Sequence, residues 1–159
     1  MYLVWAEKCK FLEEAIIKNY FNTKCFYWID IGIMRFTNKI DYYRNFPSTN
    51  KCLSDPRVLF NQIRKFRSRE IYYFKKLNNK FYKKFMKLYN VGAGMFGGQS
   101  ESLKKFIDLY YNTVRLFANN NMFIGKDQNL FAYIALFNPN LVNMVYSGEN
   151  WFYFLNYLN

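Results

Sequence analysis

Asp30 is the residue whose type and position point most directly to chemistry in this chain of 159 residues. It lies towards the end of the almost continuous apolar run 25–32 (CFYWIDIG), whose aromatic and β-branched residues and lack of alternation are typical of a strand covered on both faces. An ionised carboxylate there costs free energy unless it faces a cleft or a cation. Ligands of α/β proteins bind at the carboxyl ends of strands, and Mn²⁺ and Mg²⁺ prefer oxygen ligands. Asp30 is therefore a candidate ligand of a metal ion; the alternative is that it caps the turn at Gly32.

Asp127 is the second candidate, in the segment Gly125-Lys126-Asp127-Gln128. This segment follows the apolar residues 122–124 and begins an expected helix, whose first amide groups favour anions and hydrogen-bond acceptors. Asp127 is suited to bind sugar hydroxyls or to act as a general base. It is equally suited to cap the helix without any further function.

Four of the seven glycines fall within residues 92–98, at Gly92, Gly94, Gly97 and Gly98. Their spacing matches G-x-G-x-x-G, but a dinucleotide fold requires an acidic residue about twenty positions later, and none stands there. No G-K-[ST] element of a phosphate-binding loop is present either. Two interpretations stay open: backbone that lets a sugar lie against it at a strand end, or a structural turn.

Histidine is absent from the sequence, which excludes Ser-His-Asp and Cys-His catalysis and every zinc site that contains histidine. Cys9, Cys25 and Cys52 are odd in number and far apart, so the sequence predicts no disulfide framework, with Cys9 and Cys25 as small buried side chains. A reducing compartment follows. Without a signal-like start or an apolar run of about 18 residues, we expect a soluble, cytoplasmic protein without a transmembrane segment.

The formal net charge of +12 raises the possibility of nucleic-acid binding. Basic residues interleave with aromatic residues between 64 and 87, a mixture that suits single-stranded nucleic acid. In residues 81–88, however, the apolar positions recur at helical spacing, which predicts buried aromatics and a solvated lysine face. Nucleic acid is therefore the less favoured partner, and a basic rim that attracts phosphates fits equally well.

The elements that must position these residues alternate between helical and strand patterns. An amphipathic helix is expected over 4–19, with Trp5, Lys8, Phe11, Leu12, Ala15 and Ile16 on one face. Residues 35–56 read as a long irregular excursion, 60–66 are ambiguous, 71–74 lean towards a strand, and a helix is expected over 78–88. Helices over 101–118, 127–137 and 150–158 and a strand over 141–146 complete a single α/β domain, 1–159, with a mixed sheet flanked by helices.

Four motifs carry a resemblance to a known family: Trp5-x-x-Lys8-x-x-Phe11-Leu12-x-x-Ala15, Phe26-Tyr-Trp-Ile-Asp30-Ile-Gly32, Gly92-Ala-Gly94-Met-Phe-Gly97-Gly98 and Gly125-Lys-Asp127-Gln128. In this order they resemble the HtrL/YibB-like family, whose assignment as glycosyltransferases is itself inferred. The resemblance implies the C-terminal portion of a GT-A-like nucleotide-diphospho-sugar transferase fold. It implies transfer of a sugar from a nucleotide-sugar donor to a glycan or other hydroxyl acceptor, in polysaccharide or glycoconjugate synthesis.

The resemblance also implies roles for individual residues. Asp30 matches the Asp-x-Asp element that holds Mn²⁺ or Mg²⁺ against the donor diphosphate, although Gly32 stands where the second aspartate would be. Gly97 and Gly98 would line the acceptor pocket, Trp28 and Gln128 would bind substrate, and Asp127 would be the general base of an inverting transfer.

One departure from the family bears on partners. Such transferases begin with a nucleotide-binding strand and helix ahead of the helix that contains Trp5, where this sequence starts. An exposed sheet edge is then expected, with self-association or a partner chain that completes the fold. The alternatives to a transferase are a non-catalytic remnant or carbohydrate-binding module of the same fold, and a nucleic-acid-binding protein.

Overall fold

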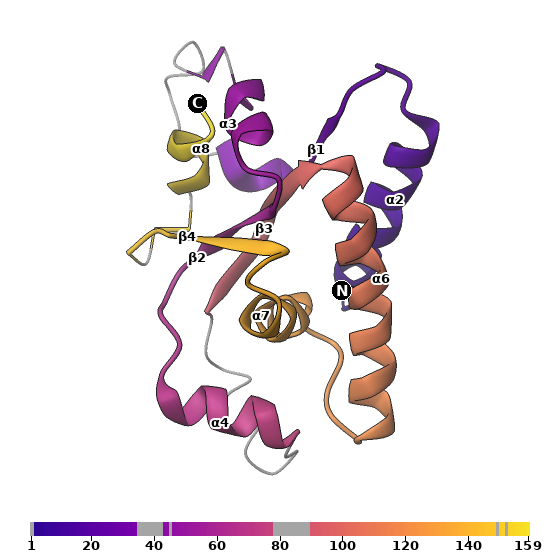
Figure 1. Ribbon diagram of the computed structural model, residues 1–159, viewed down its shortest axis with the longest axis vertical. Coiled ribbons are helices and arrows are strands. Elements are labelled where there is room, and N and C mark those ends of the chain that lie inside the picture. Colours follow the sequence, from indigo (N-terminus) through magenta and orange to yellow (C-terminus); the bar gives the residue numbers. More distant parts are fainter. Residues whose placement is uncertain (1, 35–42, 45, 78–89, 149, 152) are drawn as a thin grey trace.

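A computed structural model describes residues 2–34, 43–44, 46–77, 90–148, 150–151 and 153–159 (Figure 1). The N-terminal part contains α1 (Tyr2–Ala6), α2 (Lys8–Lys18), β1 (Cys25–Ile29), a 3-10 turn (Ile31–Met34), α3 (Thr49–Ser54), β2 (Val58–Gln62) and α4 (Ser68–Lys76). The C-terminal part contains β3 (Val91–Gln99), α6 (Ser100–Asn119), α7 (Asp127–Phe137), β4 (Val142–Tyr146) and α8 (Tyr153–Tyr157). The expected α/β architecture, a mixed sheet flanked by helices, is confirmed.

The four strands form one sheet in the order β1-β3-β2-β4. β3 lies in the middle and pairs antiparallel with β1 and β2, whereas β4 runs parallel to β2. The glycine-rich segment is therefore a central strand and not a turn. Gly97 is required there, because a Cβ at this position would lie 2.3 Å from the carbonyl oxygen of Phe26 on β1.

The larger core lies between the sheet and helices α2, α6 and α7, which Figure 1 shows on one side of the strands. At its centre Phe60 of β2, Phe96 of β3, Phe106 of α6 and Phe131 of α7 are almost fully buried, with ring centroids 4.9–6.0 Å apart. Such pairs add about 0.5–1.5 kcal/mol each beyond their buried area. A smaller core packs α8 against the opposite face of the sheet.

Helix α2 buries only part of the expected face, together with Cys9. Lys8, Cys9, Leu12 and Ile16 are buried, whereas Phe11 is 53% exposed and Ala15 is exposed. The cause is that α2 packs against both α6 and β1, which rotates Cys9 into the core and leaves Phe11 beside Trp28 at its rim. The prediction that Cys9 is a buried apolar side chain is confirmed.

Two expectations for the middle of the chain were wrong. The excursion over 35–56 contains helix α3, and residues 71–74 belong to helix α4 and not to a strand. The aromatic residues of α4 favour a strand by their propensity. They are helical here because Glu70 and Phe74, four residues apart, are both buried on one face of the helix. The carboxylate of Glu70 also accepts the N–H of Arg67 (2.8 Å), which fixes the first turn.

The absence of a disulfide was also wrongly predicted. Cys25 at the start of β1 and Cys52 in α3 are disulfide-bonded, with their Cα atoms 6.2 Å apart. The register explains the contact: Cys25 faces Gln99, whose side-chain amide donates to the carbonyl of Cys52 (3.2 Å). Cys25 is thus not a free buried thiol, and the expectation of a reducing compartment loses its basis.

The later elements agree closely with expectation. The helices expected over 101–118 and 127–137 are α6 and α7, and the strand expected over 141–146 is β4. The last helix is shorter than expected, and the helix expected over 78–88 lies outside the described residues. No helix in the described parts of the chain is long and apolar enough to cross a membrane.

Among the described strands β1 and β4 lie at the two edges of the sheet. Exposed apolar side chains lie on the end of α2 and the turn that leads into β1, at Ile17, Tyr20 and Phe21. Self-association through the β1 edge stays a prediction.

Candidate functional site

A cavity of about 380 Å³ opens at the end of β1 and beside β3. Elements from both halves of the chain contribute to its wall: Trp5, Lys8, Asp30, Gly32, Asn61, the β3 residues 92–95, Asp127, Gln128 and Trp151. Asp30 and Asp127, the two carboxylates expected from the sequence, therefore lie in the same cavity.

An irregularity in β3 builds the cavity wall. Phe60 and Asn61 are adjacent on β2, but their partners on β3 are Phe96 and Gly92, so Ala93, Gly94 and Met95 bulge out between them. β-bulges redirect groups away from the ladder and are frequent beside active sites. Here the bulge aims two carbonyl groups at the site: that of Gly94 accepts the N–H of Asp30 (2.8 Å), and that of Ala93 accepts a hydrogen bond from Lys8 (2.9 Å).

Lys8 is the centre of the charged cluster. Its side chain is only 6% exposed, and its Nζ lies 3.0 Å from Asp127 Oδ2 and 3.4 Å from Asp30 Oδ1. The Nζ is also 5.7 Å from the centre of the Trp28 ring. A buried ammonium requires such neighbours, because removal of an unpaired charge from water is expensive.

Asp30 presents one paired and one open carboxylate oxygen. Its Oδ1 accepts a hydrogen bond from the indole Nε1 of Trp28 (2.6 Å) in addition to the contact with Lys8. Its Oδ2 faces Gly94, where an added Cβ would approach to 3.2 Å. Because the side chain is 46% exposed, Oδ2 can accept hydrogen bonds from a molecule in the cavity.

Asp127 is the buried partner, with 4% of its side chain exposed at the start of α7. Its Oδ1 accepts the backbone N–H of Gln128 (2.8 Å), so it also serves the helix terminus. Burial raises the pKa of the Asp127 carboxyl above its usual value, and the positive charge of Lys8 opposes that rise. Asp127 therefore combines a carboxyl group of raised pKa with a neighbouring cation that limits the rise.

The sequence profile of a protein family described as "Bacterial protein of unknown function (HtrL_YibB)" matches residues 1–158. The chain belongs to this family. No curated protein and no solved structure matches the chain in the corresponding searches.

The remaining residues proposed from the sequence divide into two groups. Gln128 lines the cavity, and Trp28 reaches it through its hydrogen bond to Asp30. Gly97 and Gly98 lie farther along β3, packed against Phe26 and Arg57, and are not among the cavity-lining residues. The substrate roles of these four residues stay predictions.

Several residues of the HtrL/YibB site were not singled out from the sequence, foremost among them Lys8. The signal was present, because Lys8 stands on the otherwise apolar face of the expected helix, beside Trp5 and Leu12. Asn61 and Trp151 were also missed. The Asn61 amide donates to the carbonyls of Asn150 (3.2 Å) and Trp151 (3.1 Å), and so holds Trp151 at the cavity.

The donor set does not fit the expected Mn²⁺ or Mg²⁺ ion. Among the described residues no group of three or more carboxylate, histidine or cysteine ligands exists. At Asp30, the position where a cation would bridge to Asp127 is taken by the ammonium of Lys8. A resident divalent ion would have to displace a buried lysine that donates to the carbonyl of Ala93 and is ion-paired with both carboxylates.

The basic stretch lies apart from this cavity in its described part. Arg64 is paired with the buried Glu70, and the Nζ of Lys65 lies 5.1 Å from the centre of the Tyr146 ring. None of the basic residues 64–76 is among the cavity-lining residues. The lysines at 80, 83, 84 and 87 lie outside the described residues.

Proposed function

We propose that this protein transfers a glycosyl group from a nucleotide-sugar donor to a hydroxyl group of a glycan or similar acceptor. The observation that carries the proposal is the position of Asp127: a buried carboxylate of raised pKa, in a cavity, beside a second carboxylate and a lysine. A general base must be basic enough to accept a proton and held in a fixed position. Asp127 has both properties, because burial raises its pKa while Lys8 and the Gln128 amide hold its two oxygens.

The proposed reaction is a single displacement at the anomeric carbon of the donor. The acceptor hydroxyl gives its proton to Asp127, and its oxygen forms the new bond to the anomeric carbon. The bond between that carbon and the diphosphate oxygen breaks, and its electron pair leaves with the nucleoside diphosphate. Asp30, through its open Oδ2, orients a sugar hydroxyl and does not take part in the proton transfer.

A second candidate function is carbohydrate binding without turnover. It is supported by the side chains of Trp5 and Trp151, which line the cavity beside the carboxylates. Aromatic faces pack against the apolar faces of sugar rings, and carboxylates accept their hydroxyl protons. Both candidates use the same cavity and differ in whether Asp127 acts as a base.

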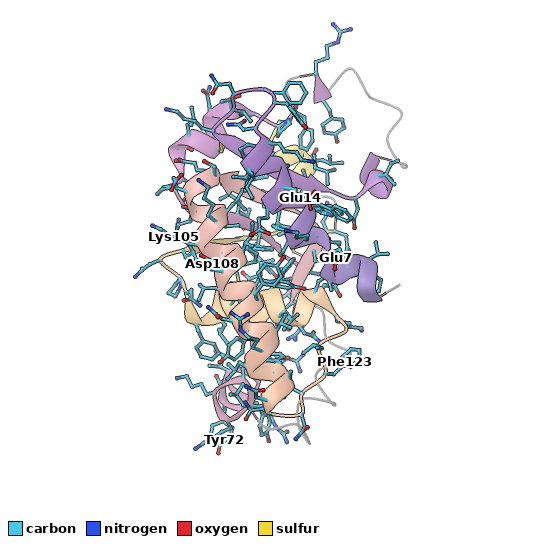
Figure 2. The ribbon with its side chains drawn as sticks, turned by 90° about the vertical axis from the view of Figure 1, so that its right-hand side faces the viewer. Glu7, Glu14, Tyr72, Lys105, Asp108 and Phe123 are labelled. Atoms are coloured by element: carbon cyan, nitrogen blue, oxygen red, sulfur yellow. A yellow bond between two sulfur atoms is a disulfide. The ribbon has the colours of Figure 1, made fainter. Side chains whose placement is uncertain are left out.

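The test is an assay of nucleoside diphosphate release from UDP- and GDP-sugars in the presence of a panel of saccharide acceptors. We expect release that depends on the acceptor, and a decrease in kcat of roughly 100- to 10,000-fold in Asp127→Asn. Asp108→Asn makes the same chemical change at an exposed position on the outer face of α6 and leaves kcat unchanged (Figure 2).

Three other outcomes would contradict the proposal. Saturable saccharide binding without release from any donor identifies the binding module. Release that survives Asp127→Asn removes the assigned base. Binding of random oligonucleotides that weakens steeply with salt and ignores Asp127 and Asp30 identifies a nucleic-acid-binding protein.

A further inference from the structure

We infer that the cavity binds a neutral, hydroxyl-rich ligand and does so without a divalent metal ion, because the ammonium of Lys8 occupies the place between the two carboxylates. This inference deepens the proposed function and rests on it for the assignment of the cavity to glycosyl transfer. It assigns the cavity to sugar hydroxyls and leaves the donor diphosphate outside it.

The first step concerns the hydrogen-bonding capacity of Lys8. An ammonium group has three protons, and its Nζ has three oxygen neighbours: Ala93 O at 2.9 Å, Asp127 Oδ2 at 3.0 Å and Asp30 Oδ1 at 3.4 Å. Lys8 donates one hydrogen bond, to the carbonyl of Ala93, and its other two contacts are ion pairs with the carboxylates. A phosphate oxygen would therefore have to compete with two carboxylates for this ammonium.

The second step concerns charge. The described residues that line the cavity carry one positive group, Lys8, and two carboxylates, Asp30 and Asp127. A diphosphate is negatively charged. The described lining of the cavity also has more negative than positive groups, and its cation, Lys8, is already paired with both carboxylates. Binding of a phosphate in such a place is disfavoured by repulsion and by loss of hydration.

The third step concerns what the cavity wall offers to a ligand. Among the described residues no donor is bonded to Asp30 Oδ2, and this side chain is 46% exposed. The amide of Asn61, also in the wall, is buried and donates to two backbone carbonyls, so it offers no hydrogen to an anion. The accessible acceptor Asp30 Oδ2 suits a ligand that supplies hydrogen-bond donors. Sugar hydroxyls are neutral groups of this kind.

The fourth step concerns the metal. Mg²⁺ and Mn²⁺ require several oxygen ligands around the ion, and one or two carboxylates are its usual anchors. Lys8 stands within 3.4 Å of one oxygen of each carboxylate. A divalent ion placed to bridge the carboxylates would lie almost on the ammonium, where repulsion excludes it. Lys8 therefore offsets one of the two negative charges, at the place where an ion would lie.

Tryptophan fluorescence provides a direct test, because Trp5 and Trp151 line the cavity and Trp28, the third tryptophan of the chain, is bonded to Asp30. The full chain is titrated with neutral mono- and oligosaccharides, with pyrophosphate and with UDP, each in Mn²⁺ and in EDTA. We expect at least one saccharide to shift the emission saturably, with equal affinity in Mn²⁺ and EDTA. Pyrophosphate and UDP do not displace it.

Two variants locate the binding. Asp30→Asn weakens saccharide binding roughly ten- to a hundredfold, the effect of one lost charge-assisted hydrogen bond. Gly94→Ala leaves the lysine cluster in place but puts a methyl group 3.2 Å from Asp30 Oδ2, so it also weakens binding. Asp108→Asn, on the exposed face of α6, binds as the native protein does.

The inference is overturned if binding requires Mn²⁺, if EDTA abolishes it, if pyrophosphate or UDP competes with the saccharide, or if no saccharide binds. The assays distinguish failure of this inference from failure of the proposed function. Sugar transfer that requires Mn²⁺ supports the transferase and contradicts the inference. Saccharide binding that needs no metal and leads to no transfer supports metal-independent binding and contradicts the transferase.

Discussion

Replacement of Lys8 by methionine is the most direct perturbation of the site, because methionine keeps the volume of the side chain and removes its charge. Asp127, 4% exposed, then loses its cation, and the carbonyl of Ala93 loses its donor. Asp30 is 46% exposed and can be hydrated, so it adds little to the loss. Removal of one partner from a buried ion pair costs about 3–5 kcal/mol. For a chain of this length that corresponds to a decrease in Tm of roughly 6–20 °C.

The loss depends on pH in a defined direction. In Lys8→Met nothing opposes burial, so the pKa of Asp127 rises further above that of an aspartate in the unfolded chain. The folded variant then holds a proton on Asp127 over a range in which the unfolded chain has lost it, and its stability falls as the pH rises through that range. The deficit relative to the native protein is therefore larger at pH 8 than at pH 5, with a slope of at most about 1.4 kcal/mol per pH unit.

Urea denaturation of both proteins at several pH values measures this difference. Lys10→Met is the matched control, because Lys10 lies on the same helix, pairs with Glu13 and has 47% of its side chain exposed. We expect this variant to change the free energy of unfolding by less than about 1 kcal/mol. The double variant Lys8→Met/Asp127→Asn removes both charges and recovers about 1–2 kcal/mol. A loss below about 1 kcal/mol in Lys8→Met, or a deficit that does not change with pH, would refute the buried ion cluster.

Two further predictions concern the framework of the site. Gly97→Ala prevents folding or lowers the free energy of unfolding by more than about 3 kcal/mol, because its Cβ meets the backbone of β1 at 2.3 Å. Gly92→Ala is the control and costs far less, because its Cβ meets only the Ile63 and Asn61 side chains, at 3.2–3.5 Å. Equal stabilities of the two variants in thermal denaturation would contradict the register of β1 and β3. Reduction of the Cys25–Cys52 disulfide, which closes a separation of 27 residues, costs roughly 3.5 kcal/mol by loop-closure entropy, measured by urea denaturation with and without dithiothreitol. A Cys52→Ser variant is insensitive to the reductant, and an equal response of both proteins would exclude the bond.

The C-terminal half of the fold could be predicted because its signals are local. Asp127 and Asn138-Pro139 mark the ends of α7, and the spacing of Leu103, Phe106 and Tyr110 defines the buried face of α6. The middle of the chain could not be predicted in this way. Residues 71–74 favour a strand by propensity, and only the burial of Glu70 and Phe74 by the rest of the molecule makes them helical.

The site could be predicted in its carboxylates but not in its balance of charge. Asp30 was recognisable because an acidic residue directly after an apolar strand is unusual. Asp127 was recognisable because an acidic residue at a helix start is a frequent cap and lies beside free backbone amides. Lys8 was not, because a lysine on a helix is ordinarily solvated; its place on an otherwise apolar face indicates burial but does not show which carboxylates it meets. The bulge at Ala93–Met95 is equally invisible, since it is a difference in register between β2 and β3.

The position of Lys8 changes what the missing second aspartate means. Considered from the sequence, Gly32 in place of an acid leaves Asp30 as a poor metal ligand. In the structure Asp30 has a second carboxylate nearby, Asp127, which comes from a distant part of the chain, and the cation between them is a side chain. A covalently attached ammonium cannot dissociate as an ion can, and its charge does not depend on the supply of metal. The ammonium already offsets one of the two carboxylate charges before any ligand arrives. We therefore expect substrate binding to depend on hydrogen bonds to Asp30 and on the tryptophan faces.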